Sequence, residues 1–152
     1  MKSAEHRGAE LLRRFRKLSR HFIAREQEFV RMAWALGRHG ESVIHSLGEE
    51  DEITMGALAR TIGLSLSSMT DIIDGLEKNG FVTRVRSAAD RRVIHLRLTP
   101  NGRRVYRRGF DAQVRFASAL LSILTRKEQD LLLSLHRKID EGMNAKTRKT
   151  KP

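Results

Sequence analysis

The chain of 152 residues contains no cysteine and only two prolines. The lack of cysteine excludes disulfides, thiolate metal sites and cysteine-based redox sensing. No apolar run approaches the roughly 18 residues that a membrane span needs, and the first residues lack the apolar core of a signal peptide. These absences predict a cytoplasmic protein with no membrane segment.

The residues that are present describe a basic, helix-forming protein. Hydrophobic residues make up 39% of the chain and charged residues 32%, which is typical of a soluble, largely helical unit of one domain's size. The formal net charge is +12 and the pI is near 11.1. This charge fits a polyanion partner, and the alternatives are a merely soluble basic surface or an anionic membrane surface. Because residues 84–108 hold nine arginines and one acid, Asp90, the distribution favours the polyanion.

Residues 54–62 are predicted to form the first helix of a helix-turn-helix. Thr54 can cap its free amides, and Gly63 can supply the positive φ of a tight corner. Small Ala59 lets a second helix cross closely. The side chains expected to share the apolar face are Met55, Leu58, Ala59 and Ile62.

A second helix is expected to follow Ser65, which can cap it, and to end at Asn79 and Gly80. Its apolar side chains recur with helical spacing at Met69, Ile72, Ile73 and Leu76. The outward or flanking side chains are short and polar: Ser67, Ser68, Thr70, Asp71 and Asp74. Short side chains let a helix backbone lie deep in a major groove, so this row predicts DNA contact.

Residues 81–86 and 93–98 alternate with period two and are joined by the polar residues 87–92, which predicts a hairpin rich in arginine. Three segments then resemble the MarR family of bacterial winged-helix transcription regulators. They are Leu-Glu-Lys-Asn-Gly-Phe-Val at residues 76–82, Asp-Arg-Arg at 90–92 and Leu-Thr-Pro-Asn-Gly at 98–102. The close match covers about a third of the chain, and its order and spacing are specific.

The resemblance implies a mainly α (α+β) fold: a winged helix-turn-helix with a helical dimerisation lobe formed by the N- and C-terminal helices. It also implies a homodimeric, sequence-specific regulator, specifically a ligand-responsive repressor on a palindromic operator. The partners would be double-stranded DNA, a second copy and a small anionic aromatic ligand, with no cofactor. A winged helix that binds proteins instead of DNA is the alternative, although an arginine-rich wing argues against it.

The chain is divided into four segments by its apolar patterns. Residues 1–40 are expected to be a dimerisation segment, built on one long helix over residues 9–36 that Gly37 closes. Residues 41–102 would be the DNA-binding region, with a short helix at 41–47 and an exposed acidic loop at 49–52 whose acids need no partner. The arginines and lysines of the long helix, among them Arg13, Arg14, Arg16 and Lys17, are read as a solvated face.

Residues 103–145 are expected to be C-terminal dimerisation helices. Thr99 and Pro100 can begin the first, and Thr125 and Glu128 have the capping-box spacing that begins the second. Their apolar stripes exceed what one packing partner covers, so a second copy is expected to cover them. Residues 146–152 are polar and basic, and are predicted to be a disordered tail.

The residues predicted to contact DNA are Thr54, Ser65, Ser67, Ser68, Thr70, Asp71, Arg84, Arg86, Arg91 and Arg92. By resemblance, Asp90 pairs with Arg84 and holds the wing in shape, while Arg92 enters the minor groove. Many relatives carry a basic residue where Asp71 stands. Asp71 either accepts a bond from a cytosine amino group or orients a neighbouring arginine, and the second is favoured because phosphates repel a carboxylate.

His39, Glu41 and His45 lie close together in sequence and allow three readings. A polar helix surface is favoured over a metal site, because two ligands at helical spacing are common and cysteine is absent. The third reading is a small-ligand pocket, for which the candidate residues are Trp34, Arg38, His39 and His45. No nucleophile, phosphate loop or acid–base pair stands out elsewhere, so the chain is not expected to be an enzyme.

Overall fold

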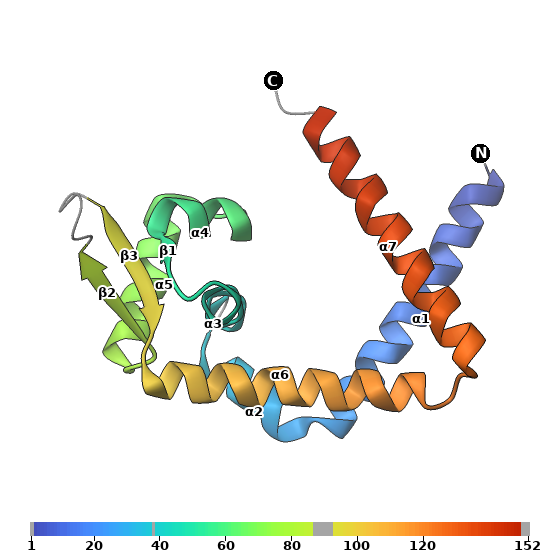
Figure 1. The fold of residues 1–152 in the computed structure, drawn as a ribbon, viewed down its shortest axis with the longest axis horizontal. Helices are drawn as coiled ribbons and strands as arrows, with labels where there is room; N and C mark the ends of the chain where they lie inside the picture. Colours follow the sequence, from blue (N-terminus) through green and yellow to red (C-terminus); the bar gives the residue numbers. More distant parts are fainter. Residues whose placement is uncertain (1, 38, 87–92, 150–152) are drawn as a thin grey trace. The chain divides into compact units, whose positions relative to one another are not determined.

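A computed structural model describes residues 2–37, 39–86 and 93–149 (Figure 1). Its elements, in chain order, are α1 (Lys2–Arg25), α2 (Gln27–Ala35), α3 (Gly40–Glu49), β1 (Ile53–Thr54), α4 (Met55–Ile62), α5 (Leu66–Lys78), β2 (Val82–Arg86), β3 (Ile94–Leu98), α6 (Pro100–Leu121) and α7 (Arg126–Lys149). The chain forms two compact units, Met1–Gln113 and Val114–Pro152. The predicted fold class, mainly helical with a small wing sheet, is confirmed.

The first unit is built around a three-stranded antiparallel sheet of order β1-β3-β2. Figure 1 shows this sheet and helices α3, α4 and α5 gathered near the start of α6. The side chains of the core are Val43, Ile44, Leu47, Ile53, Leu58, Ala59, Met69, Ile73, Leu76, Val82, Leu96 and Leu98. The winged helix therefore closes its own core within one chain.

The helix-turn-helix is set by local hydrogen bonds that the sequence predicted. Thr54 Oγ1 accepts from the amide of Ala57 at 3.3 Å and caps α4. Gly63 ends α4 with φ of 77°, a left-handed conformation that glycine adopts without strain. Ser65 Oγ accepts from the amide of Ser68 at 3.2 Å and caps α5. These three predictions are confirmed.

The expectation of one unbroken helix over residues 9–36 is wrong. The helix starts earlier, at Lys2, and is interrupted at Glu26, whose φ of −108° and ψ of 45° are not helical. The hydrogen bonds from Glu26 N to Phe22 O and from Val30 N to Glu26 O remain at 2.9 and 3.0 Å, so the break is a kink. Neither proline nor glycine marks it. Beyond the kink, Phe29 of α2 lies against Gly109 of α6, where a Cβ would meet the ring at 2.8 Å.

The predicted start of α6 is also confirmed. The hydroxyl of Thr99 accepts from the amide of Gly102 at 3.1 Å, and Pro100 occupies the first helical position. Gly102 lies so close to the preceding strand that a Cβ there would stand 2.0 Å from the carbonyl oxygen of Phe81. The N-terminus of α6 is thereby packed directly against the base of the wing.

The second unit contains the end of α6, a turn and α7. The carboxylate of Glu128 accepts from the amide and the hydroxyl of Thr125, both at 2.8 Å, as the capping-box spacing predicted. Gln129 Nε2 donates to the carbonyls of Leu121 and Leu124 at 3.0 and 3.1 Å and closes the turn.

The predicted disorder of residues 146–152 is corrected in part. Helix α7 continues to Lys149, because neither proline nor glycine occurs between Met143 and Lys151. Residues 150–152 lie outside the described residues. Over the described part of the chain, no helix is both long and apolar enough to cross a membrane.

Candidate nucleic-acid interface

Helix α5 has one buried face and one polar face. Met69, Ile73 and Leu76 are buried in the core. All the side chains predicted to face DNA from this helix or its cap are exposed: Ser65, Ser67, Ser68, Thr70 and Asp71. The capped turn between α4 and α5 sets the direction of this polar face, so the structure brings these residues together on one surface.

The hydroxyls of this face are partly satisfied inside the protein. Ser65 Oγ lies 3.0 Å from Ser67 Oγ and donates to Ser68 Oγ at 2.9 Å. Thr70 Oγ1 donates to the carbonyl of Leu66 at 2.9 Å. Thr54, the other predicted contact, is half-buried and its hydroxyl caps α4. Each of these hydroxyls keeps a lone pair or a proton that can meet a phosphate or a base edge.

Asp71 is exposed on α5, and no hydrogen bond or ion pair joins it to any residue that the structure describes. The predicted pairing with a neighbouring arginine is therefore not present among these residues. Arg84, the arginine of the wing's first strand, lies instead against Asp74 and Glu77, one and two turns further along the helix.

Arg84 joins the wing to α5 by three contacts. Its Nη2 lies 2.5 Å from Asp74 Oδ1, its Nη1 bonds Glu77 Oε2, and its backbone amide donates to Glu77 Oε1 at 3.2 Å. The hydrogen bond to Asp74, opposed by partial burial and helped by Glu77, raises the pKa of Arg84 above its ordinary value. The guanidinium of this predicted DNA contact is thus held inside the protein by two carboxylates.

The remaining wing arginines differ from Arg84. Arg86 stands at the exposed end of β2, and no acid pairs with it among the residues described. Asp90, Arg91 and Arg92 lie outside the described residues, and so does the predicted pairing of Asp90 with Arg84.

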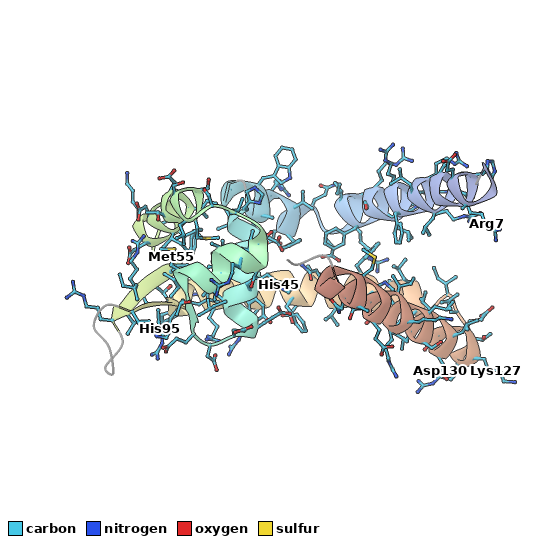
Figure 2. All side chains as sticks on the ribbon, turned by 90° about the horizontal axis from the view of Figure 1, so that it is seen from above. Arg7, His45, Met55, His95, Lys127 and Asp130 are labelled. Carbon is cyan, nitrogen blue, oxygen red and sulfur yellow. The ribbon has the colours of Figure 1, made fainter. Side chains whose placement is uncertain are left out.

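The acids before β1 do have partners, contrary to expectation. Glu52 Oε2 accepts from Arg97 Nε at 2.6 Å, and its other oxygen lies 2.7 Å from Nδ1 of the half-buried His95. Asp51 accepts from Arg103 at 3.0 Å. Figure 2 shows His95 on the strand side of this unit.

The reason for these pairs is sheet register. Residues Ile53 and Thr54 of β1 pair with Leu96 and His95 of β3, which brings the acid before β1 beside Arg97. The sequence did not predict these pairs because their signal, pairing between strands about 40 residues apart, is not local. Arg84, Arg97 and Arg103 are therefore neutralised by acids from other segments, and the basic surface is smaller than the sequence count indicated.

The candidate ligand residues do not all come together. His39 and His45 line an open groove of ≈ 420 Å³ with Glu41 and other residues of α3 and α4. Trp34 is 83% exposed on α2 and does not line it, and Arg38 lies outside the described residues. Over the described residues, no three His, Asp or Glu side chains are grouped so as to hold a metal ion.

A second hollow lies between α2, α3 and α6, and it is filled. His45, labelled in Figure 2, packs edge-to-face on Tyr106 with ring centroids 5.8 Å apart. The space left among Phe29, Tyr106 and their neighbours is ≈ 10 Å³. This is far below the roughly 300–1,000 Å³ of ligand pockets, so a ligand would enter here only if Tyr106 moved.

Comparison with known sequences finds regulators. The model of the MarR family matches residues 42–94. The HTH-type transcriptional regulator FarR of Neisseria gonorrhoeae is 31% identical over 108 residues, 68% of this chain and 73% of that protein. The uncharacterized HTH-type transcriptional regulator YsmB of Bacillus subtilis is 32% identical over 104 residues, 68% of this chain and 63% of YsmB. The transcriptional repressor MprA of Escherichia coli is 35% identical over 91 residues, 60% of this chain and 52% of MprA. The chain thus matches less than two thirds of the length of YsmB and of MprA.

Solved structures share the fold. A MarR family protein of Bacillus stearothermophilus has a TM-score of 0.75 at 26% identity, covering 92% of this chain and 97% of that one. FabT of Streptococcus pneumoniae, solved in complex with DNA, has a TM-score of 0.73 at 19% identity, covering 93% and 98%. NadR, solved with 4-hydroxyphenylacetate, has a TM-score of 0.64 at 24% identity, covering 86% and 89%. At the lower identities the likeness concerns the fold alone.

Proposed function

The chain belongs to the MarR family of winged helix-turn-helix transcription regulators, which are not enzymes, and from this premise we propose that it is a homodimeric, ligand-responsive repressor of a palindromic DNA operator. Its site of action is then the cytoplasm, where the DNA is. Its relative MprA is a transcriptional repressor, which supports repression rather than activation.

The observation that carries the proposal is the exposed polar face of α5, placed by two N-caps and a glycine turn beside an arginine-bearing strand pair. Ser67, Ser68 and Thr70 are short enough to let α5 lie deep in a major groove. The wing beside it then reaches the adjacent minor groove. FabT binds DNA with the same fold, which supports this docking.

A homodimer is supported by the apolar side chains that each unit leaves exposed. Leu11, Phe15 and Leu18 of α1 are at least 38% exposed, and Leu131, Leu135 and Ile139 of α7 at least 49%. A monomer rarely exposes such stripes, and a second copy can bury them by the same surface on both sides. Two α5 helices would then meet half-sites about 34–36 Å apart on the DNA.

The wing contributes affinity through Arg92, with Asp90 holding the tip and Arg86 and Arg91 meeting phosphates. Replacing Arg92 by Ala is expected to cost about 1–3 kcal/mol of specific binding. Asp90→Ala is expected to weaken binding even though it removes a negative charge from a DNA-binding surface. Tighter binding by Asp90→Ala would show that the acid only repels phosphates.

Ligand control is placed in the groove that His39 and His45 line. Imidazole N–H groups can donate hydrogen bonds to an anionic aromatic molecule, and NadR binds 4-hydroxyphenylacetate within the same fold. A ligand there changes DNA affinity only if it binds the two conformations of the dimer unequally. The probe is salicylate, titrated against wild type and against a variant carrying His39→Ala and His45→Ala, with the thermal midpoint and DNA affinity as readouts. A shift that survives in the variant would remove this groove from the proposal.

The experiment that tests the function is equilibrium binding to duplex DNA over a series of salt concentrations. A pool of random duplexes is selected for binding, and the enriched sequence is expected to be a palindrome. The logarithm of the binding constant for it should fall linearly with the logarithm of salt concentration, with a slope of about −0.9 for each phosphate contacted. Sedimentation gives the assembly in parallel. A protein that enriches no duplex, or that binds a palindrome as a stable monomer, contradicts the proposal, and the first result is the one expected of a protein-interaction module.

A further inference from the structure

Arg84 is the described arginine of β2 that contacts α5. Strand β2 is an edge strand of the sheet, because the order is β1-β3-β2. The amide of Arg84 points away from β3 and donates to Glu77 Oε1 at 3.2 Å, so a helix side chain takes the place of a further strand. The guanidinium of the same residue binds Glu77 and Asp74. Backbone and side chain of one residue therefore hold the wing on α5.

This contact is more than a surface ion pair. The side chain of Arg84 is only 26% exposed and that of Glu77 37%. Two guanidinium nitrogens and one backbone amide are engaged at the same time, and such multiple hydrogen bonds fix geometry in a way that a single exposed pair does not.

The charges on α5 point to the same role. Asp71, Asp74 and Glu77 are spaced by three residues, so they follow one another along the helix. Facing a polyanion, all three would repel it. Arg84 pairs with the last two and offsets one of their two charges, and Asp71 remains without a partner among the described residues.

We propose that Arg84 is a positioning residue that joins the wing to α5 through Asp74 and Glu77, so that helix and wing dock on DNA as one rigid unit. It does not act as a phosphate contact. This inference rests on the proposed function for its effect on DNA, whereas the join itself is a property of the free protein.

The matched comparison is Arg86, two residues along the same strand and without a described acid partner. Arg86→Ala removes a cation that is free to meet a phosphate, so the salt slope is expected to fall by about one and affinity to drop at low salt more than at high salt. Arg84→Ala is expected to change the slope less than Arg86→Ala does, and most of its loss of affinity is expected to remain at high salt.

The deciding variant is Glu77→Ala. Removal of a negative charge beside DNA would by electrostatics alone tighten binding. If Arg84 positions the wing, Glu77→Ala instead weakens binding by about fivefold, within the range of coupling seen between residues of one salt-bridge network. Asp111→Ala, an exposed acid of α6 without a described partner, controls for the change of net charge.

Combination of the variants separates positioning from general damage. The double variant of Arg84→Ala and Glu77→Ala is expected to bind no more weakly than the worse single variant, because both break one join. Additive losses would overturn the proposal.

A measurement without DNA keeps the join testable if the proposed function fails. In Glu77→Ala the amide of Arg84 loses its acceptor, so its hydrogen exchange is expected to become faster while the amides of Thr83 and Val85 change little. If the free protein shows this result and no duplex is bound by wild type, the join stands and the function fails. If wild type binds duplex DNA and Glu77→Ala binds as tightly or more tightly, the function stands and the positioning role is overturned.

Discussion

The winged helix and the terminal helices differ in how far they bury their apolar side chains. Between α3 and β3, twelve side chains form a closed core, and Leu47, Leu58 and Leu96 have no exposed surface. Along α1 and α7, none of the side chains at residues 4–25 and 126–145 is buried. The first region can be stable within one chain, whereas the second leaves apolar side chains exposed.

The two regions differ in how many helices and strands pack around the same apolar side chains. In the winged helix, three helices and a sheet surround the same leucines, and α4, α5 and the strands are tied by caps and ion pairs over short distances. Helix α7 has exposed leucines at 131, 132, 133 and 135, and the turn before it is closed by the hydrogen bonds of Gln129. Mutations should therefore act on folding in the first region and on assembly in the second.

The largest effect is expected in the closed core. Leu58→Ala should lower the free energy of unfolding by about 2–5 kcal/mol, because it removes buried methyl groups and leaves a cavity. Leu66→Ala, on an exposed leucine of the same region, should stay within about 0.5 kcal/mol. Urea denaturation measures the free energy of unfolding of both variants. Similar losses would mean that the core is not closed in this chain.

The next effect concerns the terminal helices. Leu135→Glu should weaken the homodimer by about 1.5–3 kcal/mol per side chain that the second copy buries. Sedimentation equilibrium gives the dimer constant, and hydrogen exchange of α4 and α5 reports whether the winged helix is intact. Loss of protection in α4 and α5 with an unchanged dimer constant would reverse the assignment of the two regions.

One glycine substitution in the winged helix and one in α7 should change stability in opposite directions. Gly48→Ala should destabilise the protein by about 1–3 kcal/mol, because a Cβ at Gly48 would lie 2.2–2.4 Å from ring atoms of Tyr106. Gly142→Ala, in α7, should stabilise it by up to about 1 kcal/mol, since nothing lies within 4 Å and alanine favours the helix. Thermal denaturation checks the opposite signs.

A smaller loss is expected at the N-cap of α5. Ser65→Ala leaves the amide of Ser68 without its acceptor and should cost about 1 kcal/mol. Ser134→Ala within α7 serves as the control, because its hydroxyl only bonds the carbonyl of Leu131, and it should change stability by less than about 0.5 kcal/mol. Equal effects would show that the cap does not hold α5.

The smallest effect is a pH dependence at the start of α7. The hydroxyl and amide of Thr125 hold the pKa of Glu128 below its ordinary value. A lowered pKa in the folded state stabilises the helix above the ordinary carboxyl pKa, and this contribution is lost as pH falls through the lowered value. Because Glu128 is exposed, the loss should be small. Exchange of the α7 amides in wild type and Glu128→Gln, compared at pH 7 and pH 3, measures it, and a difference that grows at pH 3 would contradict the sign.

Much of the fold could be predicted because its signals are local. The caps at Thr54, Ser65 and Thr125 and the positive φ at Gly63 each depend on residues within four positions of one another. The kink at Glu26 could not be predicted, because neither proline nor glycine marks it in the sequence. In the candidate site, too, some features follow from local sequence patterns and others do not. The exposed row on α5 follows from helical period, whereas the scatter of Trp34 and His45 does not.

The sequence by itself determined the helix-turn-helix, the polar face of α5, the hairpin and the family, since period, capping and turn chemistry act between near neighbours. Only the tertiary structure decided which charges meet. Arg84 binds Asp74 and Glu77, and Arg97 binds Glu52, because strand register and helix packing bring these groups within hydrogen-bond distance. Acids and arginines attract one another at any sequence separation, so their pairing is a property of the folded surface.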